Sequence, residues 1–105
     1  MPRKIELRVL ARTWVHAHEE DSETEIVYRP ADWALPPSRG RSGFELHADG
    51  RLVRIHPGPT DRPEEVPGRW RLEADELVLE DTPGSGASRS LRIVSATRNR
   101  LVLRR

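Results

Sequence analysis

The twelve residues FELHADGRLVRI (44–55) hold the clearest local structural signal in the chain. Apolar residues alternate with polar ones before the dipeptide Asp49-Gly50 and resume after it. An Asp-Gly pair supplies the positive φ angles that a tight turn between two strands needs. The stretch therefore predicts two antiparallel strands joined as a β-hairpin.

Two more hairpins of the same kind are predicted towards the C-terminus. Residues 70–79 alternate on both sides of Ala74-Asp75, and residues 91–103 alternate on both sides of a polar stretch from Ala96 to Asn99. Turns at such regular spacing are typical of an antiparallel meander.

The N-terminal part predicts two further strands. Residues 5–18 alternate as one long first strand, and residues 24–29 as a second. Residues 3–11 also fit a short helix, because Ile5 and Val9 are spaced four apart, and both readings stay open here. We expect at most one short helix or helical turn, within residues 1–12 or 30–38.

The whole pattern amounts to about eight short strands. It predicts an all-β fold, a single antiparallel up-and-down meander forming one small barrel domain over residues 1–105. The side chains expected to share its interior are Trp14, Phe44, Leu46, Trp70, Leu72, Leu77, Leu79, Leu91, Ile93, Leu101 and Leu103.

Composition narrows the classes of protein. The chain has 105 residues, a net charge of +1 and no cysteine, which excludes disulfides and thiolate chemistry. It has no apolar run of about 18 residues, so no transmembrane helix is predicted. The basic start, Met1 to Lys4, is not followed by an apolar signal core, so we expect a cytoplasmic protein. Balanced charges give no overall field to attract nucleic acid or a membrane.

Three stretches rich in proline and glycine interrupt the strands, at 30–42, 57–67 and 81–88. Proline cannot donate a hydrogen bond to a central strand pairing, so all three are predicted to be loops. Stiff loops that carry arginines over a rigid sheet often hold the functional residues of a protein.

Several short motifs lie along the predicted strands. They are Thr13-Trp14-Val15, residues 44–50, Gly68-Arg69-Trp70-Arg71-Leu72, Leu77-Val78-Leu79 and residues 100–104. In this order they resemble the small lipocalin-like (calycin) β-barrel proteins of bacteria. The resemblance implies an up-and-down barrel, ligand binding in a loose sense, and an arginine, here Arg104, packed over a tryptophan at the bottom of the barrel.

Residues that could contact a ligand follow from their chemistry and position. Trp14 and Trp70 can stack on a ligand or close the barrel, and His16 shares the face of Trp14. Arginines on the loops can bind an anion or pair with nearby acids such as Asp61 and Glu64. The predicted ligand-binding set is Trp14, His16, Arg29, Arg39, Arg41 and Trp70.

His16 and His18 would lie on one face of a strand, about 7 Å apart. Strand sites with two histidines bind zinc or iron in other folds, but no spacing here supplies the remaining ligands. We therefore expect a polar face near the barrel mouth, with no metal and no cofactor. The acidic run 19–21 is interpreted as a solvated turn, and Trp33 as an anchor for its loop.

The function predicted from these features is non-enzymatic binding of a small anionic or apolar molecule, at the open end of the barrel under the loops 30–43 and 57–67. The alternative is a protein-interaction or self-assembly module that uses a sheet edge or the arginine-rich loops. No nucleophile–base pair is indicated, so catalysis is not expected. Few aromatic residues argue against nucleic acid as a partner, and homo-oligomerisation is left open.

Overall fold

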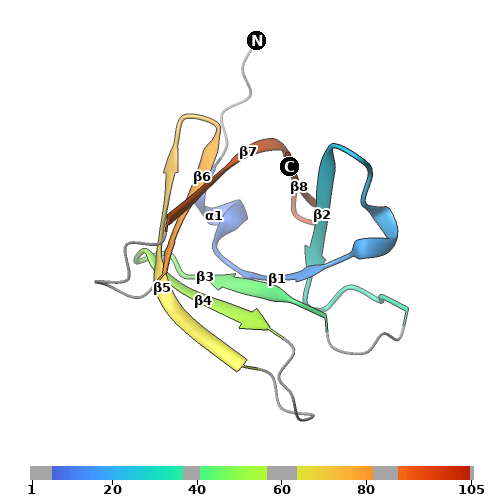
Figure 1. Cartoon of the computed structure of the whole chain (residues 1–105), viewed down its shortest axis with the longest axis horizontal. Helices are drawn as coiled ribbons and strands as arrows, with labels where there is room; N and C mark the ends of the chain where they lie inside the picture. Colours follow the sequence, from blue (N-terminus) through green and yellow to red (C-terminus); the bar gives the residue numbers. More distant parts are fainter. Residues whose placement is uncertain (1–5, 37–40, 57–63, 82–87, 105) are drawn as a thin grey trace.

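The computed structural model describes residues 6–36, 41–56, 64–81 and 88–104, and these form a closed antiparallel β-barrel (Figure 1). The predicted all-β class is confirmed, with eight antiparallel strands in an up-and-down barrel. The elements are α1 (Leu7–Leu10), β1 (Thr13–His16), the 3-10 turn η1 (His18–Glu20), β2 (Glu25–Pro30), β3 (Gly43–Leu46), β4 (Arg51–His56), β5 (Glu64–Glu73), β6 (Glu76–Asp81), β7 (Ser88–Ala96) and β8 (Leu101–Arg104).

The strands β3 to β8 follow one another round the barrel in chain order. The hairpin of β1 and β2 completes the ring, because β1 pairs with β3 and β2 pairs with β8. The strand β1 therefore lies between β2 and β3, and the connection 31–42 has to cross β1.

All three hairpins predicted from the sequence are confirmed. The β3–β4 turn contains Gly50 at a φ of 94°, where a glycine adopts the left-handed region without steric cost. The β5–β6 turn contains Ala74 at a φ of 53°, which is uncommon for a residue with a side chain. Ala96 and Leu101 are paired across the β7–β8 turn.

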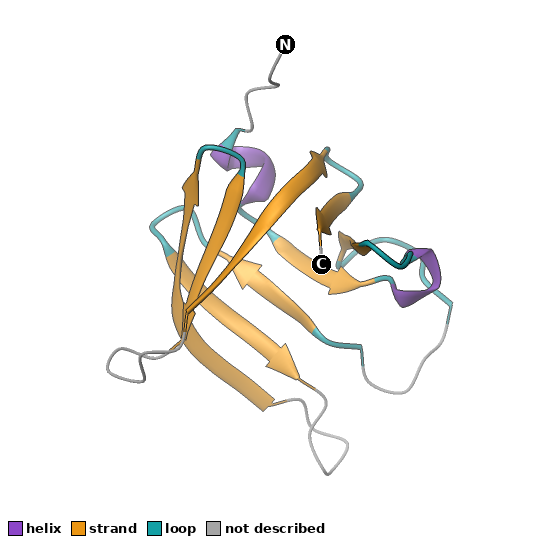
Figure 2. Ribbon diagram, turned by 45° about the horizontal axis from the view of Figure 1, so that its top comes forward, coloured by secondary structure: helices purple, strands orange, loops and turns teal. Residues whose placement is uncertain are grey.

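The two ends of the barrel differ. One end carries α1 and the turns 47–50, 74–75 and 97–100. We call it the closed end, because Leu10 of α1 is fully buried there against the interior. Figure 2 shows α1 at the same end as the β5–β6 turn. The opposite end, where β4 ends at His56 and β7 begins at Ser88, is the open end.

The side chains that fill the interior come from alternate positions of the strands, as the sequence predicts. Every side chain of the expected interior set belongs to one core cluster, with Leu72 partly buried at its margin. Leu10 and Leu52 join that cluster in addition. Leu52 is paired with Leu46 across the β3–β4 hairpin, so the phase of β4 follows directly from that pairing.

The prediction of one long first strand over 5–18 is wrong. In the described part of this segment, residues 7–10 form a helical turn and β1 spans only Thr13–His16. The indole Nε1 of Trp14 donates to the carbonyl oxygen of Leu10 at 3.0 Å, and the same carbonyl accepts the N–H of Arg12 at 2.8 Å, so Trp14 ties the end of the helical turn to β1. The helical alternative for the N-terminal residues is therefore the correct one. The sequence does not predict the second helical turn, η1. None of the described helices is long and apolar enough to cross a membrane.

Two prolines placed in loops by the sequence lie in strands instead. Pro30 ends β2, and Pro67 lies within β5 opposite Val53 of β4. Within the described ranges, residues 64–67 of β5 pair only with β4, since pairing with β6 begins at Gly68.

A small second cluster lies on the outer face of β2 and β8. Val27 and Val102 are buried there against Ala17, and Leu35 of the crossing connection packs on them. Leu35 therefore fixes the connection to the barrel. Trp33, the anchor expected from the sequence, is instead 40% exposed.

Candidate functional site

A cavity of about 210 Å³ lies inside the open end of the barrel. Side chains of β2, β3, β4, β6 and β7 contribute to its wall. Its apolar lining residues are Ile26, Phe44, Leu79 and Leu91, and its polar or charged ones are Tyr28, Ser42, Arg54, His56 and Arg89, with Gly43 between them.

The charged residues line the cavity because they continue the inner face of their strands, and Arg89 does so from an exposed position at its rim. In β4, Arg54 and His56 follow the buried Leu52 at intervals of two. In β7, Arg89 precedes the buried Leu91 by the same interval. The interior face is thus apolar towards the closed end and cationic towards the open end.

The register places each of the two cavity arginines beside an apolar side chain. Arg54 is paired with Phe44 across β3 and β4, and Arg89 is paired with Leu79 across β6 and β7. His56 is one step further out than Arg54 on the same face. No acidic side chain lines the cavity among the described residues.

The closed end is filled, in contrast. Trp14 is fully buried, and Trp70 is 6% exposed with its Nε1 donating to the carbonyl oxygen of His47 at 2.7 Å. Both indole N–H groups are therefore used by the backbone at or near the closed end. Neither Trp14 nor Trp70 lines the cavity.

His16 stands next to the cavity wall without lining it. Its ring centroid is 5.4 Å from that of Tyr28, which in turn is 4.8 Å from that of Phe44. The His16 Nε2 atom lies 2.7 Å from Oδ2 of Asp21, whose Oδ1 accepts the N–H of Val27. These contacts fix His16 and tie the segment after β1 back to β2.

The prediction that His16 and His18 share one face of a strand is wrong, because the strand ends at His16 and His18 begins η1. Their rings meet edge to face with centroids 6.1 Å apart. Within the described ranges, no three side chains of the metal-binding types come together.

The arginines of the loop region are engaged in ion pairs. Arg29 binds both carboxylate oxygens of Glu20 at 2.7 Å, and its guanidinium lies 4.4 Å from the ring centroid of Trp33. Arg41 binds Glu19 and the carbonyl oxygen of His16. Arg39 and Asp61 lie outside the described residues. The sequence leaves open that the loop arginines pair with acids, and it suggests Asp61 and Glu64 as those acids. In the structure the partners of Arg29 and Arg41 are Glu20 and Glu19.

The acidic run after β1 is therefore more than a solvated turn. Hydrogen bonds from Arg41 lower the pKa of Glu19 from 4.5 to about 2. Hydrogen bonds from Arg29 lower the pKa of Glu20 in the same way. Both carboxylates stay ionised at neutral pH and hold the segment to its arginines.

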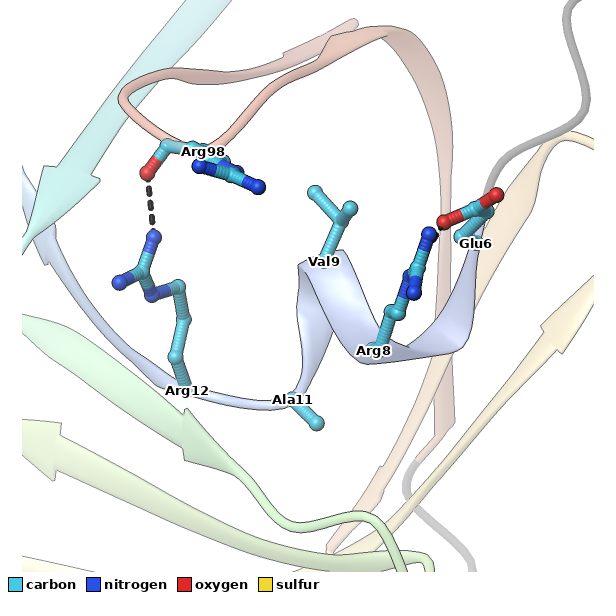
Figure 3. Close-up of a pocket in the computed structure, with 6 residues that line it drawn as sticks. All are labelled: Glu6, Arg8, Val9, Ala11, Arg12 and Arg98. Atoms are coloured by element: carbon cyan, nitrogen blue, oxygen red, sulfur yellow. Dashed lines mark hydrogen bonds and ion pairs between the residues drawn. The ribbon is translucent and has the colours of Figure 1, made fainter.

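A second hollow, of about 650 Å³, lies on the outside of the closed end (Figure 3). Its lining residues are Glu6, Arg8, Val9, Ala11, Arg12 and Arg98. Arg12 donates to the carbonyl oxygen of Arg98, and Arg8 pairs with Glu6. The Arg12 guanidinium lies 5.6 Å from the centroid of the Trp14 ring, so Arg12 takes the position over the tryptophan that the resemblance assigned to Arg104.

None of the residues that line the open-end cavity belongs to the predicted ligand-binding set, and the cationic side chains missed there are Arg54, His56 and Arg89. Their signal was the phase of their strands, since each lies an even number of residues from a buried leucine. In β4 that phase is hidden in the sequence, because Val53 and Ile55 are as apolar as Leu52.

Comparisons with protein-family models, with curated proteins and with solved structures gave no match. The architecture alone bears on the resemblance stated above. An eight-stranded antiparallel closed barrel, with a tryptophan in its first strand and a filled closed end, is compatible with a lipocalin-like fold.

Proposed function

We propose that the protein binds a small molecule in the open-end cavity and does so without catalysing a reaction. The observation that carries this proposal is the difference between the two ends of the barrel. Tryptophans and leucines fill the closed end, while a cavity of about 210 Å³ with convergent polar groups lies inside the open end. Concave, mostly apolar sites with a few polar groups are the usual form of ligand sites.

The volume sets the size of the ligand. An eight-stranded barrel has an interior that side chains can fill or that holds one small ligand. A cavity of roughly 150 Å³ accommodates benzene in another protein. The present cavity of about 210 Å³ therefore suits a single ring with a short side chain.

Binding is favoured over catalysis by the lack of an activated nucleophile in the described cavity wall. Ser42 and His56 both line the cavity. However, no hydrogen bond joins them among the contacts of the described residues, and no carboxylate lines the cavity to orient the imidazole. The pair lacks the arrangement that acyl transfer needs.

The alternative, an interaction or self-assembly module, has less support. Arg29 and Arg41 are already paired with Glu20 and Glu19. Within the described ranges, the part of β5 that pairs with β4 alone reads Glu64-Glu65-Val66-Pro67, and charges and proline disfavour strand addition there. A discrete oligomer in native mass spectrometry, with no retained small molecule, would favour this alternative. The proposal also includes a cytoplasmic location, which cell fractionation tests.

The binding proposal is tested by amide chemical shifts during titration with 3-phenylpropanamide, a neutral ring compound of suitable size. We expect shifts at residues that line the cavity, such as Phe44 and Leu79. Leu91→Trp fills the cavity and should abolish them, whereas Val94→Trp on the outer face of the same strand should not.

Circular dichroism first confirms that each variant is folded, and Ile26→Phe is a second filling variant if Leu91→Trp is not. The proposal fails if the cavity amides of the wild type shift neither with this amide nor with 3-phenylpropionate, the acid of the same shape. It also fails if a folded filling variant binds as well as the wild type.

A further inference from the structure

Among the described residues, the charged side chains that line the open-end cavity are all basic, although the charges of the whole chain are balanced. The chain has 18 basic and 17 acidic residues. The cavity lining contains two guanidinium groups and one imidazole, and it contains no acid among the described residues. Such a site favours a negatively charged occupant.

Several arginines elsewhere in the described structure face a carboxylate. Arg29 pairs with Glu20, Arg41 with Glu19 and Arg71 with Glu73 and Glu80. Other examples are the pairs Arg51–Asp49 and Arg92–Asp75. Arg89 lines the cavity and pairs with no acid among the described residues.

We propose that the ligand is a small organic acid, whose carboxylate is held by Arg89 and Arg54 and whose apolar part lies against Phe44, Leu79 and Leu91. This inference rests on the proposed function and names the chemical class of its ligand. A guanidinium presents two parallel N–H donors that match the two oxygens of a carboxylate. His56 is placed to give a further hydrogen bond on the outer side.

The register gives the ligand its dimensions. Arg54 is opposite Phe44 and Arg89 is opposite Leu79, while Leu91 lies deeper on the inner face of β7. The cationic and apolar parts of the site are therefore adjacent. A ring separated from its carboxylate by a short spacer fits this arrangement, and a long unbranched chain exceeds the cavity of about 210 Å³.

The hollow outside the closed end is also rich in arginine but differs in two ways. Its Arg8 is already paired with Glu6. Val9 and Ala11 are the only apolar side chains among the described residues that line it. It lacks the apolar wall beside the cations that distinguishes the barrel cavity.

The test compares two probes of the same size and shape, 3-phenylpropionate and the neutral 3-phenylpropanamide. Dissociation constants are measured by amide shift titration at neutral pH. We expect the wild type to bind the acid roughly tenfold more tightly than the amide, because hydrogen bonds to charged groups are stronger than neutral ones.

The variants locate the source of that preference. Arg89→Gln should remove most of it while leaving the affinity for the amide nearly unchanged. Arg92→Gln is the matched control, with the same loss of charge on the same strand but on its outer face, and should keep the preference. Arg54→Gln, once circular dichroism shows that it is folded, should act like Arg89→Gln.

Each remaining outcome is decisive. Equal affinity of the wild type for both probes overturns the acid proposal and leaves the binding proposal standing. A preference that survives in both Arg89→Gln and Arg54→Gln overturns it as well. If neither probe binds, the acid proposal and the proposed function fail together.

Discussion

Gly43 lies at the seam between β1 and β3, and replacing it by alanine tests how the barrel closes. A Cβ atom at this position would lie 2.3 Å from the carbonyl oxygen of Trp14 and 3.3 Å from the Cα of Val15. Both are backbone atoms of β1, so no side-chain rotation can relieve the contact. The two strands have to move apart instead.

The magnitude follows from that displacement. Real Cβ atoms essentially never approach a neighbour closer than 3.0 Å, so the seam opens by at least roughly 0.7 Å. The adjacent hydrogen bond from His16 N–H to the Ser42 carbonyl, now 2.8 Å, would lengthen to roughly 3.5 Å and be lost. Overpacking costs about 1 to 3 kcal/mol, and one backbone hydrogen bond contributes about 1 kcal/mol. Gly43→Ala should therefore destabilise the fold by about 2 to 4 kcal/mol.

Urea denaturation followed by circular dichroism measures this loss. With a slope of about 1 to 3 kcal/mol per molar, the unfolding midpoint should fall by on the order of 1 to 2 M. Ser42→Ala at the neighbouring position removes only a hydroxyl group and should stay within about 0.5 kcal/mol of the wild type. If Gly43→Ala were as stable as this control, the close approach of β1 to β3 would be wrong, and with it the closure of the barrel.

Two further perturbations test the core and the acidic run. Leu101→Ala, at a fully buried position, should lower the free energy of unfolding by roughly 2 to 5 kcal/mol. Val94→Ala on the outer face should change it by less than about 1 kcal/mol. Equal unfolding midpoints of the two variants in urea would refute the assigned interior face. Glu19→Gln should destabilise the fold at neutral pH, because a carboxyl whose pKa falls from 4.5 to about 2 on folding stabilises the native state above pH 4.5. That contribution is lost as the pH falls through 2, so the difference from the wild type should narrow between pH 4.5 and 2. A difference that stays constant over this range would show that Arg41 does not hold the Glu19 carboxylate.

The candidate site could be predicted from the sequence only in outline. A cavity at the open end of a small barrel was expected, and so was an anionic or apolar ligand. Of the residues proposed to bind it, Arg29 and Arg41 pair with the acids after β1, and Trp14 and Trp70 fill the other half of the barrel. Arginines near acids in sequence suggest pairing, but which acid is nearest depends on how the crossing connection passes over β1.

The parts of the fold that follow from the sequence alone are those set by neighbouring residues. The pair Asp49-Gly50 favours a tight turn through its own backbone preferences. Alternation with a period of two defines the inner face of a strand once one buried residue is known. The three hairpins and the interior leucines other than Leu10 and Leu52 were predictable for that reason. These interactions span only a few residues along the chain.

The tertiary structure alone decided which strands close the barrel and which end stays open. The pairings of β1 with β3 and of β2 with β8 join segments far apart in the chain, and no local pattern specifies them. Leu10 is buried only because α1 meets that closed ring, and Arg89 faces a cavity only because the ring brings β7 together with the residues of β2, β3 and β4 that line the other walls. Long-range packing sets these features, because a side chain's surroundings in a barrel come from strands across the interior and from no neighbour in the sequence.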